Sequence, residues 1–316
     1  MLHWEPFWEP SRAPAAAPLS PTHKGTPVTI TRPTPAPAAP AWLVELAPRI
    51  RIVFCDLDDT LLDACHQVPA RTAQVVRRLH RCGVRFSPAT GRTVPALRGL
   101  FGSLSDEIDF VAGNGTDVSV DGCTIYHAPY PRAAALELFD AVKGSRQRLG
   151  FVTFDETGPH LASVEADFVR AHVESLRHAP VCPDELLFAG RELGKVGVVA
   201  PQGAAAGVEE LERAMGGLFS FAPTGPYWID VLVRGIDKAQ GIDRMLAHLG
   251  IDPSEALAFG DSMNDVAMME LLPNTVAVSN AMPELKRLCA HEIGSNLDEA
   301  VLDCLDQLCE LRERRP

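Results

Sequence analysis

Three acidic residues follow a short apolar run near the start of the chain, in the stretch Ile52-Val-Phe-Cys55-Asp56-Leu-Asp58-Asp59. The run from Ile52 to Cys55 is typical of a parallel strand that is covered on both faces. Asp56 and Asp58 are two residues apart, so in extended backbone their side chains project to the same side. Adjacent carboxylates repel each other unless a cation lies between them or one is protonated. The stretch therefore predicts either a metal site with a nucleophilic acid at a strand end, or an acidic turn that caps the next helix.

A second apolar run, much later in the chain, also ends in acids: Ala256-Leu-Ala-Phe-Gly-Asp261-Ser-Met-Asn264-Asp265. In open α/β sheets, reactive groups collect beyond the carboxyl ends of parallel strands, so the two acidic ends are expected to meet. Four carboxylates in one place are strongly unfavourable without a cation, and Mg²⁺ is the natural partner of oxygen ligands. The candidate Mg²⁺ ligands are Asp56, Asp58, Asp261 and Asp265.

Two further segments carry groups that neutralise a phosphate. Ser87-Pro-Ala-Thr90-Gly91-Arg92 follows a second strand and precedes a helix, a pattern that suits an anion cradle built from a hydroxyl and backbone N–H groups. Lys238 adds an ammonium near the start of a helix expected over 237–249. Unaided hydrolysis of phosphate monoesters is extremely slow, and a site with a metal, a cation and a nucleophile fits that reaction. These residues predict phosphoryl transfer through an aspartyl-phosphate.

The elements that position these groups divide the chain into three parts. A chain of 316 residues is long enough for two domains. Alternating strands and helices over 49–129 and 233–316 predict an α/β core with a Rossmann-like, mainly parallel sheet. Strands and helices over 130–232 carry no clusters of acids and glycines at their ends, and this segment is predicted to be an inserted α+β cap domain. Residues 1–48 are dominated by Pro and Ala and are predicted to be a disordered extension.

Composition narrows the class of partner. The chain has 29 basic and 41 acidic residues and a net charge of -12, which argues against nucleic-acid or anionic-membrane binding. Its 8 cysteines form no CxxC pair and are expected to be reduced thiols, with no disulfide framework or zinc site. No apolar run reaches the ~18 residues of a membrane helix, and no secretory signal is recognisable. A cytoplasmic protein is therefore predicted, with its oligomeric state left open.

Four ordered motifs resemble those of the haloacid dehalogenase-like hydrolases: Asp56-Leu-Asp58-Asp59-Thr60, Thr90-Gly91-Arg92, Lys238 and Gly260-Asp261-Ser-Met-Asn264-Asp265. The large insert between the second and third motifs resembles the Cof-type sugar-phosphatase subfamily. Gly113-Asn-Gly115 and Ser279-Asn-Ala-Met-Pro-Glu284 are similar to sequences of that subfamily, and the resemblance covers about residues 50 to 300. One departure is Asp59, where the broad family more often has Gly, and this residue is expected to point away from the metal.

The resemblance implies two catalytic residues. Asp56 would be the nucleophile and also a Mg²⁺ ligand. Asp58 would be the general acid/base, which protonates the leaving alcohol and then activates water, and it would ligate the metal through its backbone carbonyl.

The resemblance also implies the residues that bind phosphate and complete the metal site. Thr90, with Gly91, and Lys238 would hold the transferring phosphoryl group. Asn264 would lie near the phosphate and help to orient Lys238. The metal site would be completed by Asp261, with Asp265 as a further ligand or as an acid behind the ligands.

The predicted function is Mg²⁺-dependent hydrolysis of a small phosphomonoester, with a sugar phosphate as the preferred class. The alternatives are a phosphatase of a phosphorylated cofactor (pyridoxal phosphate or flavin mononucleotide), a phosphomutase, and a catalytically idle protein that uses the fold to bind a ligand or partner. The expected partner is a small phosphorylated metabolite. Candidate leaving-group contacts in the cap domain are Lys195 and the loop 155–158.

Overall fold

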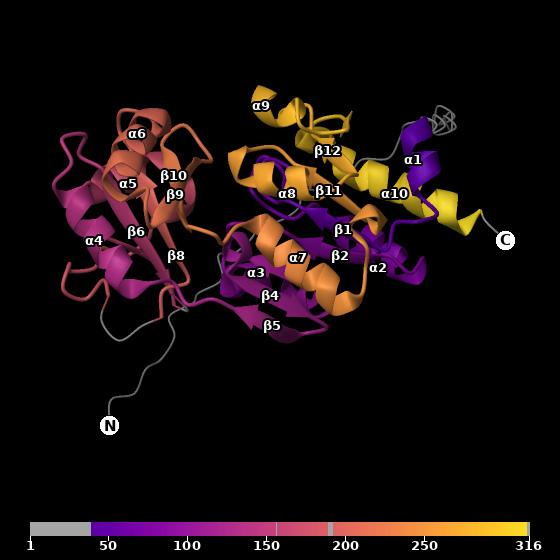
Figure 1. The fold of residues 1–316 in the computed structure, drawn as a ribbon, viewed down its shortest axis with the longest axis horizontal. Coiled ribbons are helices and arrows are strands. Elements are labelled where there is room, and N and C mark those ends of the chain that lie inside the picture. The colour runs from indigo at the N-terminus through magenta and orange to yellow at the C-terminus, as the bar shows by residue number, and fades with distance from the viewer. Residues whose placement is uncertain (1–38, 156, 189–191, 315–316) are drawn as a thin grey trace, which may run out of the picture. The chain divides into compact units, whose positions relative to one another are not determined.

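The computed structural model of the protein describes residues 39–155, 157–188 and 192–314 (Figure 1). Among these residues the strands form three sheets, with the orders β13-β12-β11-β1-β2, β7-β6-β8-β10-β9 and β3-β4-β5. The first sheet is parallel throughout. The predicted α/β fold with a mainly parallel sheet is confirmed.

The parallel sheet is built around β1 (Ile52–Cys55), which pairs with β11 (Ala256–Gly260) on one side and β2 (Arg85–Pro88) on the other. Beyond β11 lie β12 (Thr275–Ala277) and β13 (His291–Glu292). Every residue of β1 and β11 is buried, as their continuous apolar sequences predict for central parallel strands. The two acidic segments therefore leave neighbouring strands at the same edge.

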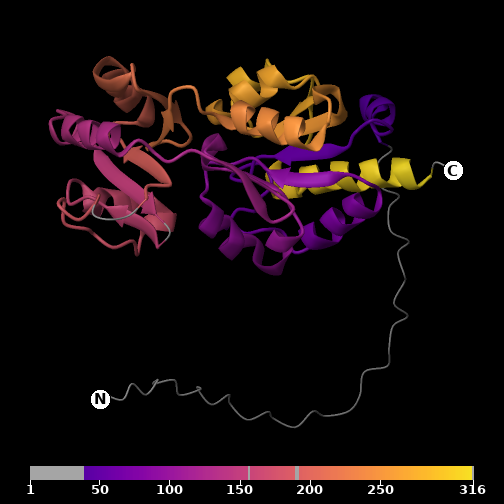
Figure 2. The ribbon, with the colours of Figure 1, turned by 60° about the horizontal axis from the view of Figure 1, so that its bottom comes forward.

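Helices cover both faces of the parallel sheet (Figures 1 and 2). One face packs against α2 (Thr72–Arg81) and α10 (Ala300–Glu313), which contact each other. The other carries α7 (Lys238–Leu249) and α8 (Val266–Leu271). The short helix α9 (Pro283–Lys286) lies between β12 and β13 in the chain. Burial of both faces explains why the strands need no alternation of polar and apolar residues.

A small antiparallel sheet extends the core beyond β2. It consists of β3 (Phe110–Ala112), β4 (Asp117–Val120) and β5 (Cys123–His127), and a parallel bridge between Ala89 and Val111 joins it to the chain that leaves β2. Asp121 and Gly122, a pair of residues that favours a tight hairpin turn, connect β4 with β5. The helix α3 (Val94–Phe101) lies between β2 and β3 in the chain.

The second five-stranded sheet is antiparallel and comes from a single stretch of chain. Its strands are β6 (Gly150–Asp155), β7 (Gly158–Leu161), β8 (Lys195–Val199), β9 (Phe219–Pro223) and β10 (Trp228–Val233). Its helices are α4 (Arg132–Lys143), α5 (Ala166–His172) and α6 (Ala204–Met215). The segment has hydrophobic clusters separate from that of the parallel sheet, which supports the proposal that residues 130–232 are an inserted domain, called the insert.

One correction concerns the start of the chain. Helix α1 (Ala41–Leu46) lies within the segment 1–48 that was predicted to be disordered. The prediction is wrong for these residues because Leu43 and Leu46 are buried in the hydrophobic cluster of the parallel sheet, where α1 contacts α10. Residues 1–38 lie outside the described part of the chain. No helix in the described part is long and apolar enough to cross a membrane, and the cytoplasmic location stays a prediction.

Candidate active site

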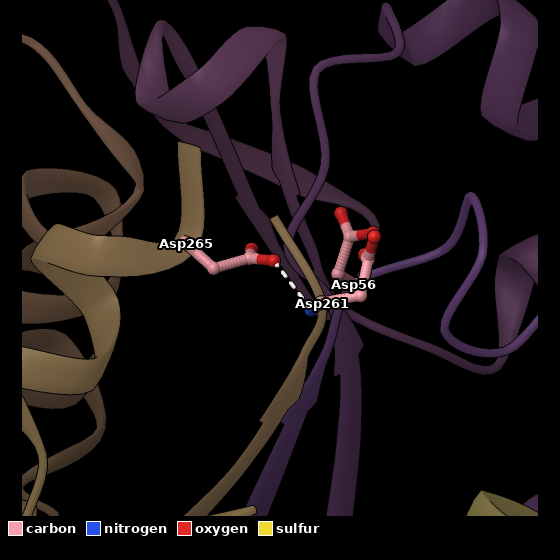
Figure 3. A group of neighbouring side chains, drawn as sticks. All are labelled: Asp56, Asp261 and Asp265. Carbon is pink, nitrogen blue, oxygen red and sulfur yellow. Dashed lines mark hydrogen bonds between the residues drawn. The ribbon is translucent and has the colours of Figure 1, made fainter. Parts of the chain in front are cut away.

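Three carboxylates meet at the carboxyl edge of the parallel sheet (Figure 3). Asp56 follows β1, Asp261 follows β11, and Asp265 ends a short 3-10 helix, Met263–Asp265. One carboxylate oxygen from each lies within 4.8 Å of the others, and all three residues are buried. The parallel pairing of β1 and β11 is the cause, because it brings the two strand ends side by side.

Lys238 is the cation of this cluster. It begins α7, which Asp237 caps by accepting a hydrogen bond from the Gln240 N–H, and its side chain is fully buried. The Lys238 ammonium lies 2.5 Å from Asp56 Oδ1 and 2.6 Å from Asp265 Oδ1. Burial alone would lower the pKa of Lys238, but the two carboxylates outweigh it and raise this pKa, so the ammonium stays charged. Lys238 is therefore not a solvent-exposed lysine at the start of a helix.

The site holds three buried acids beside one ammonium, so ionising all of them would be costly. Burial raises the pKa of Asp56 to about 7 although Lys238 opposes the shift. Burial and the charges of Asp56 and Asp265 raise the pKa of Asp261 to about 9, against a hydrogen bond of 2.8 Å from the Thr60 hydroxyl. Such shifts mark a site where further positive charge would be strongly favoured. An all-oxygen donor set suits Mg²⁺, so the residues present fit the predicted metal.

Asp265 differs from the other two acids in that both of its oxygens already accept hydrogen bonds. Oδ1 accepts from Lys238, while Oδ2 accepts from the backbone N–H groups of Asp261 and Ser262 at 3.0 and 3.1 Å. The second set closes the turn after β11 (Figure 3). Asp265 therefore shapes the turn and orients the lysine.

Asp58 is not part of the carboxylate cluster. Its two oxygens accept hydrogen bonds from Arg92, from Nε at 2.9 Å and from Nη2 at 2.6 Å, and His66 Nδ1 lies 3.2 Å from Oδ1. Burial would raise the pKa of Asp58, but the bonds from Arg92 and His66 outweigh it and hold this pKa well below its usual range. In this arrangement Asp58 is a carboxylate. Asp59 is exposed, with its backbone O bonded to Asn280.

The Thr90 loop lies beside these acids. Thr90 is buried, and its hydroxyl accepts a hydrogen bond of 3.2 Å from the Arg92 N–H. The Asn114 N–H donates to the Thr90 carbonyl at 2.9 Å, which ties the Gly113–Gly115 turn to the loop. The segment keeps Thr90 at the end of β2, where a strand end meets a helix start, as the sequence predicts for an anion cradle.

Asn264 lies near the loop but does not orient Lys238 as the resemblance implied. Its Nδ2 donates to Asn114 Oδ1 at 3.1 Å, and its Oδ1 accepts from the Ser262 hydroxyl at 2.8 Å. Asp56 and Asp265 orient the lysine instead. The physical reason is that the Asn264 amide is already bonded to Asn114 and Ser262.

Sequence reasoning proposed Lys195 of the insert as a contact but missed its partner, Asp230. Asp230 of β10 is buried, pairs with Lys195 of β8 at 2.7 Å and accepts a hydrogen bond of 3.0 Å from Asn114. The available signal was an acid within an otherwise apolar strand, Trp228-Ile-Asp-Val. In the predicted contact loop, Asp155 accepts hydrogen bonds from the Thr157 N–H and hydroxyl, while residue 156 lies outside the described residues.

Comparisons with known proteins agree with this geometry. A family model of the haloacid dehalogenase-like hydrolases matches residues 53–305. The chain is 28% identical over 240 residues to the HMP-PP phosphatase of Yersinia pestis (strain Pestoides F), covering 75% of this chain and 86% of that one. It is 26% identical over 265 residues to the 5-amino-6-(5-phospho-D-ribitylamino)uracil phosphatase YbjI of Escherichia coli (strain K12), covering 82% and 96%. The fold resembles SMU.1108c from Streptococcus mutans UA159, with a TM-score of 0.73, 18% identity and coverage of 81% and 98%.

Proposed function

The chain belongs to the haloacid dehalogenase-like hydrolases of the Cof type and is a phosphatase, and we propose that it hydrolyses a small phosphomonoester through a covalent intermediate on Asp56. The observation that carries this proposal is the contact between Asp56 and Lys238 at 2.5 Å inside a cluster of three buried carboxylates. A carboxylate needs no base to become a nucleophile, and the neighbouring ammonium is placed to stabilise the charge of the transferring phosphoryl group.

In the first step an Asp56 oxygen attacks phosphorus, the bond from phosphorus to the leaving oxygen breaks, and that oxygen takes a proton. In the second step water attacks the aspartyl-phosphate, loses a proton, and the bond between Asp56 and phosphorus breaks. Lys238 and the Thr90 hydroxyl would hold the phosphoryl oxygens, with backbone N–H groups of the loop. This sequence returns Asp56 to its starting form and releases inorganic phosphate.

Asp58 would give the first proton and take the second. Its bonds to Arg92 and His66 favour the charged carboxylate, so it can act as an acid only after these are exchanged for a bond to the leaving oxygen. In the second step the charged form is the one required to accept a proton from water. We therefore assign Arg92 the role of a partner that holds Asp58 as a carboxylate between proton transfers.

Mg²⁺ would be held by Asp56 and Asp261, with the backbone carbonyl of Asp58, and when bound it supplies charge neutralisation at the phosphate oxygens. Asp265 would keep its place behind them, holding the lysine and the turn. Thr60, which donates to Asp261 Oδ1 at 2.8 Å, would orient that ligand.

A sugar phosphate is the proposed substrate class, and a phosphorylated cofactor is the alternative. The alternative stays open because the two relatives are named for other phosphorylated compounds, HMP-PP and a phosphorylated ribitylaminouracil. Phosphate release from a panel of sugar phosphates, pyridoxal phosphate and flavin mononucleotide separates the classes. A phosphomutase would instead convert one phosphate isomer into another without net release.

The proposed chemistry is tested by phosphate release from p-nitrophenyl phosphate with Mg²⁺. Asp56→Asn should lower kcat by about 10³-fold or more, because the amide cannot replace the nucleophile. Asp59→Asn is the matched control, since it removes a neighbouring but exposed acid, and it should keep kcat within about twofold. If the wild type and Asp56→Asn release phosphate equally slowly across the panel, the protein is a catalytically idle binder and the proposal fails.

A further inference from the structure

A buried ion pair of the insert lies against Gly91, in the loop of Thr90, Gly91 and Arg92 that is proposed to bind phosphate. The chemistry proposed above does not use this ion pair. Lys195 and Asp230 are diagonal neighbours on one face of β8 and β10, where Asp230 is paired with Gly197. Their side chains are 14% and 4% exposed, and the Lys195 ammonium lies 2.7 Å from Asp230 Oδ1. An ion pair with so little access to water needs further partners to offset desolvation.

Asp230 has those partners, and one of them belongs to the core. The Trp228 indole N–H donates to Oδ1 at 2.6 Å, and Asn114 Nδ2 donates to Oδ2 at 3.0 Å. Burial would raise the pKa of Asp230, but the charge of Lys195 and the hydrogen bonds together outweigh it and hold this pKa below its ordinary value. The carboxylate therefore accepts bonds from both oxygens and donates none.

The bond to Asn114 continues into the site. A side-chain amide has an oxygen at one end and an NH₂ group at the other, so an acceptor at one end decides which way it points. With its NH₂ group on Asp230, Asn114 presents Oδ1 to Asn264, whose Nδ2 donates to it at 3.1 Å. Asn114 also donates its backbone N–H to Thr90, and Asn264 is next to Asp265.

The contact between insert and core is close because residue 91 is a glycine. A Cβ at Gly91 would lie 2.7 Å from Asp230 Oδ2 and 3.0 Å from both Lys195 Nζ and Asn114 Nδ2. The pair is thus packed on the backbone next to Thr90. Its charges balance one to one, in contrast to the site, so it has no excess charge with which to bind a metal or a phosphate.

We infer that Asp230 is a positioning residue: when the insert packs on the core, this carboxylate fixes the direction of the Asn114 amide and, through it, of Asn264 beside the phosphate loop. The inference rests on the proposed phosphatase function. On this inference, the loop at Thr90 is ordered only when Asp230 of the insert contacts Asn114 of the core. Closure of the insert over the substrate would then also order the groups that hold the phosphoryl group.

Asp230→Asn isolates the bond in question. An asparagine keeps an oxygen for Lys195 and Trp228 but must turn an NH₂ group toward Asn114, where two donors then meet. With p-nitrophenyl phosphate and saturating Mg²⁺, kcat/KM should fall about tenfold in the wild-type background. In the Asn114→Ala background the same substitution should change kcat/KM by less than about twofold, because the residue through which it acts is gone.

Asp109→Asn is the control for a loss of stability alone. Asp109 is a buried carboxylate that accepts hydrogen bonds from Arg85 at 2.6 and 2.8 Å, away from the site residues. It should lower the melting temperature without changing kcat/KM more than about twofold. Equal losses from Asp230→Asn in both backgrounds would overturn the inference.

Hydrogen exchange gives a readout that does not depend on activity. The N–H groups of Gly113 and Asn114 donate to the carbonyls of Arg92 and Thr90. They should exchange faster in Asp230→Asn and at an unchanged rate in Asp109→Asn. If the wild type releases no phosphate, the proposed function fails while these amides still decide the inference, and unchanged exchange in Asp230→Asn would reject it.

Discussion

The core and the insert each place a lysine against buried acids, and the two clusters differ in the number of acids for each lysine. In the core, Lys238 contacts Asp56 and Asp265, with Asp261 adjacent, so one ammonium meets three acids. In the insert, Lys195 pairs with one carboxylate among the described residues, that of Asp230, which also accepts hydrogen bonds from the Trp228 indole and the Asn114 amide. The core cluster therefore has more acids than cations, while the insert cluster has one of each.

The difference shows how burial can be used for two purposes. Three buried acids beside one ammonium are costly to ionise together, so the pKa values of Asp56 and Asp261 are raised, and a divalent cation would favour their charged forms. In the Lys195–Asp230 pair, the charges balance and both carboxylate oxygens already accept hydrogen bonds. These bonds fix the positions of the side chains around the pair. The pKa shifts follow the same division, since burial dominates for Asp56 and Asp261 and partners dominate for Asp230.

Exchanging each lysine for methionine gives the sharpest test of this contrast. Lys238→Met should reduce kcat with p-nitrophenyl phosphate by about 10³-fold, because the charge next to the nucleophile is lost. Lys195→Met should reduce it far less, by about tenfold, while lowering the free energy of unfolding by about 3 kcal/mol because Asp230 is left buried without its cation. Steady-state kinetics and urea unfolding measure both. Similar losses of kcat in the two variants would contradict the division of roles.

Metal binding should stabilise the protein through the core cluster only. Mg²⁺ at about a hundred times its Kd should add about 2.7 kcal/mol to the free energy of unfolding, by mass action. Asp261→Asn should remove most of this increase, whereas Asp109→Asn should retain it. Thermal unfolding with and without Mg²⁺, with EDTA as the metal-free reference, measures the effect. An equal increase in Asp261→Asn would place the metal elsewhere.

Gly91→Ala should have the smallest effect of the three, because it disturbs the contact between the clusters and removes no charge. The added methyl meets Asp230, Lys195 and Asn114 within 3.0 Å. Their side chains must give way, which should cost about 1–2 kcal/mol and lower kcat/KM about tenfold. Gly99→Ala, where a Cβ meets nothing within 4 Å, is the matched control. Full activity of Gly91→Ala would show that the tight approach of the insert is dispensable.

Most of the core could be predicted because its signals are local. The apolar runs before Asp56 and Asp261 are continuous and end in acids. Both the type of each strand and the residue at which it ends could therefore be predicted. The Asp121-Gly122 turn was likewise predictable, since its residues have φ values of 50° and 75° that Asp and Gly accept readily. Helix α1 was missed because the contacts of Leu43 and Leu46 come from the distant α10 and its surroundings.

The site shows the same limit at the level of side chains. Residue types and motif order were enough to propose Asp56, Asp261 and Lys238 as one cluster, because strand ends of a parallel sheet must share an edge. The partners of Asp58 and Asn264 could not be predicted. Asp58 is bonded to Arg92 and His66, and Asn264 is bonded to Asn114, through hydrogen bonds that depend on loop geometry.

Asp230 is the residue for which tertiary structure matters most. In the chain it is one acid in an apolar strand, with no motif around it. The pairing of β8 with β10 brings Lys195 beside Asp230. The packing of this face of the sheet on Gly91 and Asn114 then gives Asp230 its contact with the core. Long-range packing decides whether a buried acid has a cation of its own, as Asp230 has, or shares one with other acids, as Asp56 does. Local sequence carries no record of that balance, because the compensating groups come from separate segments of the chain.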